Sequence, residues 1–191
     1  MVEILLAKTN IGKNDLVIDI GAGEGIISLQ LAKIANKVIA VEKDIELGLK
    51  LKDKLKNYNN IKVVQADFLS WSLPKEDYKI FANIPFNMTA DIVRKITQGK
   101  NSPSHAYLFM QNKAAFRFLG EPKETQVSIL LKNRFEGRTV TYIDKKEFTP
   151  IPKISIVLVE LTKRSIPLIN DDEEKLFRDF VIIVIMLGSQ Q

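Results

Sequence analysis

Short apolar runs alternate with amphipathic segments over the first 135 residues of the chain. Apolar runs that end at glycine or polar residues predict strands, and apolar positions at three- and four-residue spacing predict helices. The predicted strands span residues 16–20, 37–41, 61–66, 78–82 and 106–110, and the predicted helices span residues 24–35, 44–56, 89–97 and 125–135. This alternation predicts an α/β fold with a doubly wound, mostly parallel sheet, whose ligands bind at the carboxyl ends of the strands.

The last third of the chain has a different pattern. Two apolar runs, 140–144 and 154–161, are joined by a loop without a helix, which predicts an antiparallel hairpin at one edge of the sheet. Residues 165–172 are typical of a linker and helix cap, and a final helix is predicted over 171–187. We therefore expect a main domain over residues 1–164 and a second unit that begins within residues 165–191.

The most apolar stretch, residues 181–187, is much shorter than the roughly 20 residues that cross a bilayer, so we expect no membrane span. It predicts a core-facing helix, and since no chain follows to cover its other sides, we expect the sequence to be a fragment of a longer one. Residues 1–8 lack the basic start and long apolar core of a signal peptide and predict a helix. A cytoplasmic location is expected.

Composition narrows the chemistry. The chain has 191 residues, of which 46% are apolar and 27% charged, which suits one well-buried domain and a monomer. It has no cysteine and one histidine, His105, which excludes disulfides, thiolate metal sites and a histidine-rich metal centre, so we expect no metal. The net charge of +5 fits an anionic partner such as nucleic acid without identifying one.

A glycine-rich turn follows the first predicted strand. Gly21, Ala22, Gly23 and Gly25 separate this strand from the first helix in a GxGxG spacing. Glycines let the backbone pass close to a ligand, and a helix start offers free amide donors. The turn is therefore a candidate nucleotide site, although an ordinary tight turn also uses glycine.

Acidic residues lie at three successive strands. Glu42 ends the second strand, 19 residues after Gly23, where a carboxylate can accept hydrogen bonds from both hydroxyls of a ribose. Asp67 follows the third strand and can accept a bond from an adenine amino group. Asp19, inside the first strand, can orient the glycine turn, bind the far end of a cofactor, or be a partnered polar residue. The structural alternative for Glu42 and Asp67 is that they cap helices or face water.

The tetrapeptide Asn83-Ile84-Pro85-Phe86 follows the fourth strand at the same edge of the sheet. The Asn side-chain oxygen and a backbone carbonyl can both accept from an exocyclic amine, and the Phe ring can stack on a base. Two acceptors on one amine expose its lone pair for attack on a methyl sulfonium, with no strong base required. A nicotinamide dehydrogenase would also use the glycines and Glu42, but it explains less of this segment.

Together these segments resemble the rRNA adenine N6-methyltransferases and dimethylases, most closely the erythromycin (macrolide-lincosamide-streptogramin B) resistance methyltransferases. The likeness runs along nearly the whole chain. It is carried by residues 20–25, 41–44, 65–68, 83–86 and 148–154. The resemblance implies a Rossmann-like class I methyltransferase sheet, S-adenosylmethionine as cofactor and ribosomal RNA as partner.

The resemblance also implies roles for single residues. Phe148 would face Phe86 across a target base that has left its stack. The implied cofactor-binding residues are Asp19, Gly21, Ala22, Gly23, Glu42, Lys43, Ala66, Asp67, Phe68 and Asn83, and the implied catalytic residues are Asn83, Ile84, Pro85, Phe86 and Phe148. Phosphate contacts are expected from Arg134, Arg138, Lys145, Lys146, Lys153, Lys163 and Arg164, for which a solvated basic face is the alternative.

Two departures from the family pattern follow. The segment that closes over the cofactor in relatives precedes this chain's first residue, and most of their C-terminal helical RNA-binding domain is missing. We expect methyl transfer to an adenine of large-subunit (23S) rRNA, protein-free or precursor, which gives macrolide-type antibiotic resistance. The alternatives are a small-subunit rRNA dimethylase of ribosome biogenesis, a small-molecule or protein methyltransferase, and a noncatalytic RNA-binding module.

Overall fold

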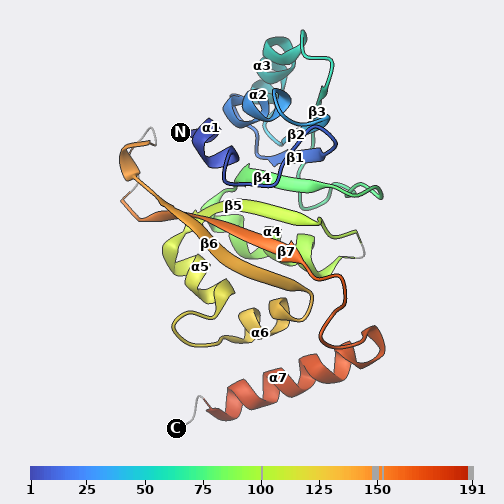
Figure 1. Cartoon of the computed structure of the whole chain (residues 1–191), viewed down its shortest axis with the longest axis vertical. Coiled ribbons are helices and arrows are strands. Elements are labelled where there is room, and N and C mark those ends of the chain that lie inside the picture. The colour runs from blue at the N-terminus through green and yellow to red at the C-terminus, as the bar shows by residue number, and fades with distance from the viewer. Residues whose placement is uncertain (100, 148–150, 152, 189–191) are drawn as a thin grey trace.

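The computed structural model describes residues 1–99, 101–147, 151 and 153–188. Within them the strands form one seven-stranded sheet in the order β3-β2-β1-β4-β5-β7-β6 (Figure 1). The strands are β1 Leu16–Ile20, β2 Lys37–Glu42, β3 Ile61–Gln65, β4 Lys79–Asn83, β5 His105–Gln111, β6 Phe135–Ile143 and β7 Ile156–Lys163. β1 to β5 are parallel, and β7 pairs antiparallel with both β5 and β6. The predicted fold class and the antiparallel pair at one edge are confirmed.

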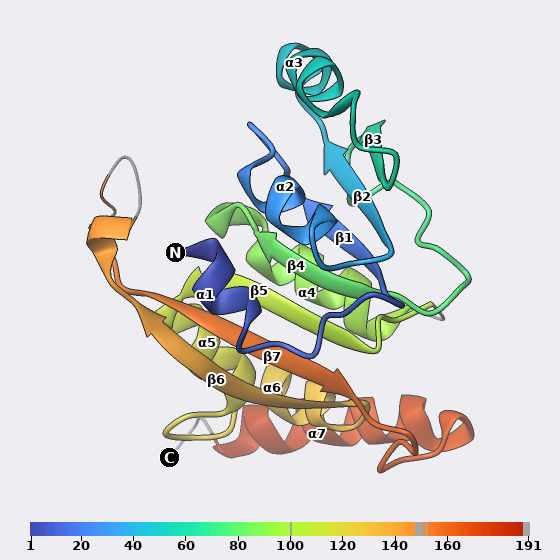
Figure 2. The ribbon, with the colours of Figure 1, turned by 45° about the horizontal axis from the view of Figure 1, so that its top comes forward.

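Helices cover both faces of the sheet (Figure 2). They are α1 Val2–Leu6, α2 Ile26–Ala32, α3 Ile45–Leu55, α4 Thr89–Gln98, α5 Asn112–Leu119, α6 Gln126–Lys132 and α7 Glu174–Gly188, with short 3-10 helices η1 Phe86–Met88, η2 Lys145–Glu147 and η3 Asp171–Glu173. α4, α5 and α6 pack on one face of the sheet, and α1 and α2 pack on the other. α3 packs against β2 and β3. α7 lies against α6, outside the layer that touches the sheet.

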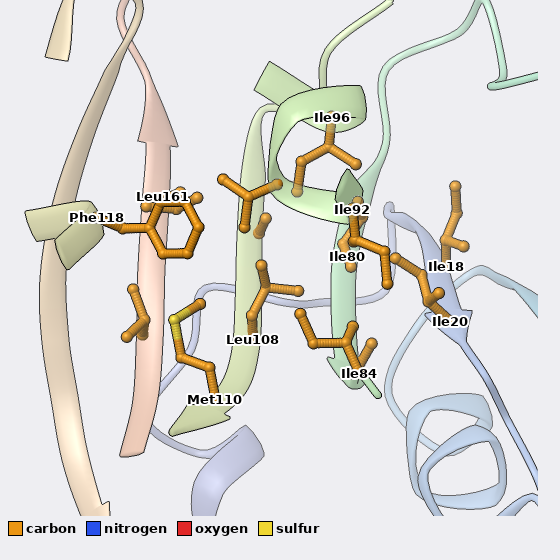
Figure 3. Packing of buried hydrophobic residues seen from close by; sticks show 14 of the residues in the cluster. Ile18, Ile20, Ile80, Ile84, Ile92, Ile96, Leu108, Met110, Phe118 and Leu161 are labelled. Atoms are coloured by element: carbon orange, nitrogen blue, oxygen red, sulfur yellow. The ribbon is translucent and has the colours of Figure 1, made fainter. Parts of the chain in front are cut away.

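The core beneath α4 explains why that helix sits where it does. Ile92 and Ile96 are four residues apart, so they share one face of the helix and pack against Ile80 and Leu108 of the sheet (Figure 3). All four side chains are buried. Burying a side chain of this size stabilises the fold by about 1.5 to 3 kcal/mol. The N-terminus of α4 is thereby fixed at the carboxyl edge of the sheet.

Two element predictions differ from the structure. The sequence pattern predicts no helix over residues 112–119, where the structure has α5. This helix follows β5 directly, without a loop to mark a new element. The predicted helix over 125–135 ends at Lys132, and Phe135 already begins β6, five residues before the predicted strand start. β6 is an edge strand whose first residues after Phe135 are exposed, so they lack the apolar alternation that marks a strand.

α7, the apolar helix at the end of the described chain, has both buried and exposed apolar side chains. Val181 is buried, whereas Leu176, Phe180, Ile183 and Leu187 are exposed. In the described part of the chain, every helix falls short of the length and apolarity needed to traverse a bilayer. The division after residue 164 stays a prediction.

Candidate active site

A cavity of about 530 Å³ opens at the carboxyl edge of the sheet, between the turn after β1 and the end of β4. Five of the predicted site residues line it together: Asp19, Gly21, Ala22, Gly23 and Asn83. A volume of this size suits a ligand the size of a nucleoside cofactor. The carboxyl ends of β1 and β4 meet here because the two strands are parallel neighbours (Figure 2).

The glycine turn is built from left-handed backbone. Gly21, Gly23 and Gly25 have φ angles of 67°, 53° and 78°. At Gly25 a β-carbon would also meet Leu51 Cδ1 of α3, so a larger residue would have to displace that buried side chain as well as adopt the left-handed conformation. The amides of Gly21 and Ala22 donate to the Val41 carbonyl at 2.8 and 3.1 Å, which fastens the turn to β2.

Glu42 holds this turn from the neighbouring strand. One carboxylate oxygen accepts from the Gly23 amide at 2.8 Å, and the other accepts from the Asp44 amide at 2.9 Å. The side chain is buried. Since each carboxylate oxygen has a second lone pair, both can still accept from a ligand hydroxyl. Glu42 therefore shapes the backbone of the site, a role that sequence spacing alone did not show.

Asp19 lies at the bottom of the cavity and is almost fully buried. Its carboxylate accepts from Ser28 Oγ of α2 at 2.6 Å. Burial raises the pKa of Asp19 to about 7, and the hydrogen bonds with Ser28 oppose that rise. Ser28 had not been predicted as part of the site, because a serine within a helix gives no sequence signal for this contact.

Asp67 follows β3 with both carboxylate oxygens engaged. Lys43 Nζ lies 2.8 Å from one oxygen, and the Leu69 amide donates to the other at 2.9 Å. These bonds, with Lys43 the largest cause, hold the pKa of Asp67 below its usual value. The half-buried Ala66 donates its amide to the Glu42 carbonyl at 2.9 Å. Phe68 is buried beneath the loop, so its ring supports the loop from the core side, and its contact with a cofactor stays a prediction.

The Asn83-Ile84-Pro85-Phe86 segment presents its residues in two directions. Asn83 is exposed and lines the cavity, and within the described residues its side chain has no hydrogen-bond partner. Ile84 is buried in the core and anchors the segment. Pro85 is exposed and Phe86 is half-buried. Asn83 is thus the polar group of this segment that is free to meet a ligand.

The segment also touches the glycine turn. A β-carbon placed on Gly21 would lie 3.8 Å from Pro85 Cδ, so the two backbones run close together. The Pro85 carbonyl accepts from the Met88 amide at 2.9 Å, and the Phe86 carbonyl accepts from Thr89 Oγ1 at 3.0 Å. Each of these carbonyls thus accepts one bond within the protein, and the backbone acceptor for the amine stays a prediction.

The loop between β6 and β7 reaches the same cavity through Glu147, an exposed residue that sequence reasoning missed. Phe148, predicted to stack on a target base, lies outside the described residues, as do Thr149, Pro150 and Pro152. Near the start of this loop, Lys145 Nζ donates to the Lys153 carbonyl at 3.0 Å. Glu147 and the glycine turn thus line the same cavity.

Three arginines predicted to contact phosphate are paired with carboxylates. Arg134 lies 2.8 Å from Glu174, Arg138 lies 2.6 Å from Glu160 and Arg164 lies 2.6 Å from Glu136. Their charges are at least partly compensated within the protein. The phosphate-contact prediction therefore falls more heavily on the lysines between β6 and β7, such as Lys146 and Lys153, which are exposed.

Comparison with known proteins gives consistent findings. The family model described as "Ribosomal RNA adenine dimethylase" matches residues 1–191. An rRNA adenine N-6-methyltransferase from Limosilactobacillus reuteri is 33% identical over 179 residues, which cover 93% of this chain and 72% of that protein. A probable ribosomal RNA small subunit methyltransferase A from Methanococcus aeolicus is 31% identical, covering 94% and 67%. The chain spans 58% of a Bacillus licheniformis rRNA adenine N-6-methyltransferase, with 30% identity over 86% of this chain.

Solved structures agree with these relatives. The 23S rRNA methyltransferase ErmE superposes with a TM-score of 0.86 and 26% identity, covering 94% of this chain and 74% of that chain. A dimethyladenosine transferase from Plasmodium falciparum gives a TM-score of 0.76 and 26% identity, covering 85% and 61%. The predicted resemblance, the predicted enzyme class and S-adenosylmethionine as the cofactor are confirmed by these matches. The chain belongs to the ribosomal RNA adenine dimethylase family.

Proposed function

We propose that this chain transfers a methyl group from S-adenosylmethionine to the exocyclic amine of an adenine in ribosomal RNA. The observation that carries the proposal is the position of Asn83. Its exposed side chain lies in the cavity beside the glycine turn and has no partner among the described residues. An amide side chain that lines a cofactor-sized cavity and keeps its own acceptor and donors available is suited to bind a substrate amine there.

The predicted cofactor-binding residues that line the cavity, and those that follow β2 and β3 beside it in the sheet, fit the cofactor. Glu42 retains lone pairs for the ribose hydroxyls while it holds the Gly23 amide. Asp67, with Lys43 beside it, would accept from the adenine amino group, and Ala66 and Phe68 would border the ring. Gly21, Ala22 and Gly23 leave the backbone open to the methionine half, and Asp19 would orient the turn through Ser28. When bound, S-adenosylmethionine supplies an electrophilic methyl group on a sulfonium.

The target base would be held by the tetrapeptide. Asn83 Oδ1 and the Ile84 carbonyl, the next backbone acceptor along the chain, would accept the two amine hydrogens. These two acceptors would expose the nitrogen lone pair for methyl transfer from the sulfonium, with the surplus amine proton passing to water. Phe86 would stack on one face of the base, and Phe148 would stack on the other. Pro85 fixes the backbone between these groups.

Large-subunit (23S) rRNA is the substrate we favour, which would make the whole protein a determinant of macrolide resistance. The superposition on the 23S enzyme ErmE, with the higher TM-score of the two matches at 26% identity, supports this choice. Small-subunit rRNA is the second candidate, because a relative of similar identity carries that name. We place the protein in the cytoplasm as a monomer, with residues 1–164 as the cofactor-binding catalytic domain and residues 165–191 as the start of a helical RNA-binding unit.

The test is methyl transfer from labelled S-adenosylmethionine to protein-free 23S rRNA, protein-free 16S rRNA and free adenosine. Label in 23S rRNA alone is expected. Mass spectrometry of the digested RNA would then show N6-methyladenosine or N6,N6-dimethyladenosine at one position. Label confined to 16S rRNA would overturn the 23S assignment and keep the reaction. Label in no RNA, from protein that binds the cofactor, would overturn the reaction.

A further inference from the structure

Lys95 belongs to α4, the helix that follows the target-base segment, yet its ammonium is directed at the loop after β3. Nζ donates to the Phe68 carbonyl at 2.6 Å and the Leu69 carbonyl at 2.9 Å, and it also donates to the Trp71 carbonyl. It lies 5.1 Å from the centre of the Phe68 ring. A lysine ammonium has three N–H donors, so all of them are used on this one loop.

The loop depends on this ammonium for its shape. Carbonyls that converge on one point repel one another unless a donor lies between them, and a buried carbonyl without a partner costs about 1 to 3 kcal/mol. Phe68 is buried, and its ring packs at 6.3 Å from that of Trp71. Burial lowers the pKa of Lys95, and the nearby Asp67 carboxylate opposes that change. Lys95 therefore stabilises the loop after β3 by satisfying its converging carbonyls from the side that faces α4.

Asp67 is the first residue of the turn that Lys95 holds. Its carbonyl accepts from the Ser70 amide at 3.1 Å and from the Trp71 amide at 2.9 Å. Its carboxylate accepts from the Leu69 amide, so backbone bonds fix both ends of this residue. The direction of the carboxylate is thus set by the backbone of residues 68–71, and Lys95 sets that backbone.

We propose that Lys95 is a positioning residue that fixes the Asp67 carboxylate for recognition of the adenine amino group of the cofactor. This inference rests on the proposed function, in which Asp67 accepts from that amino group. Because Lys95 is on the helix that begins beside Asn83 and Phe86, it also ties the cofactor loop to the target-base segment. Lys95 thus adds a side-chain link between the two halves of the site to the pairing of β1 with β4.

Lys43 provides an internal contrast. It forms the direct ion pair with Asp67, but its side chain is 70% exposed, and exposed pairs contribute little because water screens them. Lys95 acts through backbone bonds beneath the loop. We therefore expect substitution of Lys95 to change adenine recognition more than substitution of Lys43, although Lys43 is the residue that touches the carboxylate.

The experiment measures, by titration calorimetry, the dissociation constants of S-adenosylhomocysteine and of its deaminated analogue, in which a carbonyl oxygen replaces the adenine amino group. The parental protein should prefer the amino compound by about tenfold or more, since the analogue lacks the donor for Asp67 and sets a carbonyl oxygen against its carboxylate. Lys95→Met should reduce this ratio to about twofold or less, whereas Lys43→Met should change it by less than about threefold.

Arg94→Met is the matched control, because Arg94 is the neighbouring cation on α4, is 63% exposed and pairs with Asp91 of its own helix. It should keep the parental ratio. If Lys95 contributes only to stability, Lys95→Met should lower the melting temperature and leave the ratio of dissociation constants unchanged. That result would overturn the inference. Trp71 is the single tryptophan of the chain, so a red shift of its emission in Lys95→Met would report the loosened loop.

If Lys95→Met does not fold, the same measurement is made on Lys95→Gln, whose side-chain amide keeps two N–H donors for the carbonyls. Its ratio should lie between those of the parent and a nonselective protein, and a parental ratio would count against the positioning role. Parental protein that binds neither compound would instead overturn the cofactor half of the proposed function. If the parental protein binds the two compounds equally well, Asp67 does not recognise the adenine amino group, and the positioning role of Lys95 is wrong.

Discussion

The two ends of the central sheet both carry polar side chains, but they use them differently. At the amino ends of the parallel strands, Lys79 lies 2.8 Å from Asp15, and the Tyr107 hydroxyl donates to Glu160 at 2.7 Å. At the carboxyl ends, Asn83 faces a cavity and has no partner within the described residues. One end is closed by its own side chains, and the other leaves an acceptor for a ligand.

The closed end is a network around Glu160. Besides Tyr107, its carboxylate is 3.3 Å from His105 Nδ1 and accepts from the Arg138 guanidinium at 2.6 Å. Asn10, in the segment after α1, bonds to the His105 ring at 2.8 Å. Buried polar groups that are all satisfied stabilise one arrangement of the chain. The comparison predicts that changes at this end affect stability, whereas changes at the carboxyl end affect ligands.

The largest effect is expected at the closed end. Glu160→Ala removes the shared acceptor of Tyr107, His105 and Arg138, and it should cost about 3 kcal/mol of unfolding free energy, at the low end for a broken buried pair because Arg138 is largely exposed. Urea titration gives the measurement. Glu136→Ala is the control, since the Glu136 side chain is 65% exposed in its pair with Arg164, and its loss should cost less than about 1 kcal/mol. A Glu160 variant of parental stability would break the comparison.

At the open end, Asn83→Ala should lower the rate of methyl transfer by about a hundredfold, or about 2.7 kcal/mol, because one of two acceptors on the amine is lost. Single-turnover kinetics with saturating RNA and cofactor measure this rate. The melting temperature should be unchanged, since Asn83 is exposed and unpartnered among the described residues. Asn10→Ala is its counterpart at the closed end, with stability reduced and rate kept.

Glu42 combines a structural role with a ligand-binding role, because its buried carboxylate holds the glycine turn and would also bind the ribose of the cofactor. Glu42→Ala should raise the dissociation constant of S-adenosylmethionine by about thirtyfold, or about 2 kcal/mol. Titration calorimetry gives this constant. A variant that loses stability while it binds cofactor normally would assign Glu42 to the turn alone.

Phe86→Leu tests the stacking half of the site. It should raise the KM for RNA by about tenfold, or about 1.4 kcal/mol, because the aromatic face is lost and apolar volume is kept. The dissociation constant of the cofactor should stay within about twofold of the parental value. Unchanged KM with a lower rate would show that Phe86 orients the base without capturing it.

The smallest effect concerns pH. An unfolded Asp19 titrates near 3.8, and burial raises its folded pKa to about 7. The folded state therefore binds the proton more tightly, so stability falls as pH rises between these values and levels off above pH 7. Linkage gives a loss of about 1 kcal/mol between pH 6 and pH 7. Urea titrations at both pH values should show this loss in the parent and not in Asp19→Asn.

Sequence reasoning succeeded where a contact lies along the chain. The strand, glycine turn and helix that begin with β1 follow from residues 16–32, and α3 begins after Asp44, which caps it by accepting from the Leu47 amide three residues later. The residues missed are those whose partners are distant in sequence. A lysine in a helix reads as a solvent-facing residue, and only the packed fold places Lys95 under a loop 24 to 27 residues earlier.

The same limit applies to the edge strand and the site loop. β6 has exposed, polar residues after Phe135, so its strand character comes from pairing with β7 and not from its own pattern. Glu147 reaches the cavity because that hairpin extends past the sheet, a length that sequence spacing does not give. Phosphate-binding arginines were predicted from charge alone, and their carboxylate partners are known only from the fold.

The strand order has a consequence for how the chain forms during synthesis. β6 is made before β7, yet its neighbour in the sheet is β7, which in turn pairs with β5. A nascent chain that has emerged only to residue 155 therefore carries an edge strand with no place to dock. Translation would complete this side of the sheet in one step, when residues 156–163 leave the exit tunnel, and a pause just before that point would prolong exposure of an unpaired strand.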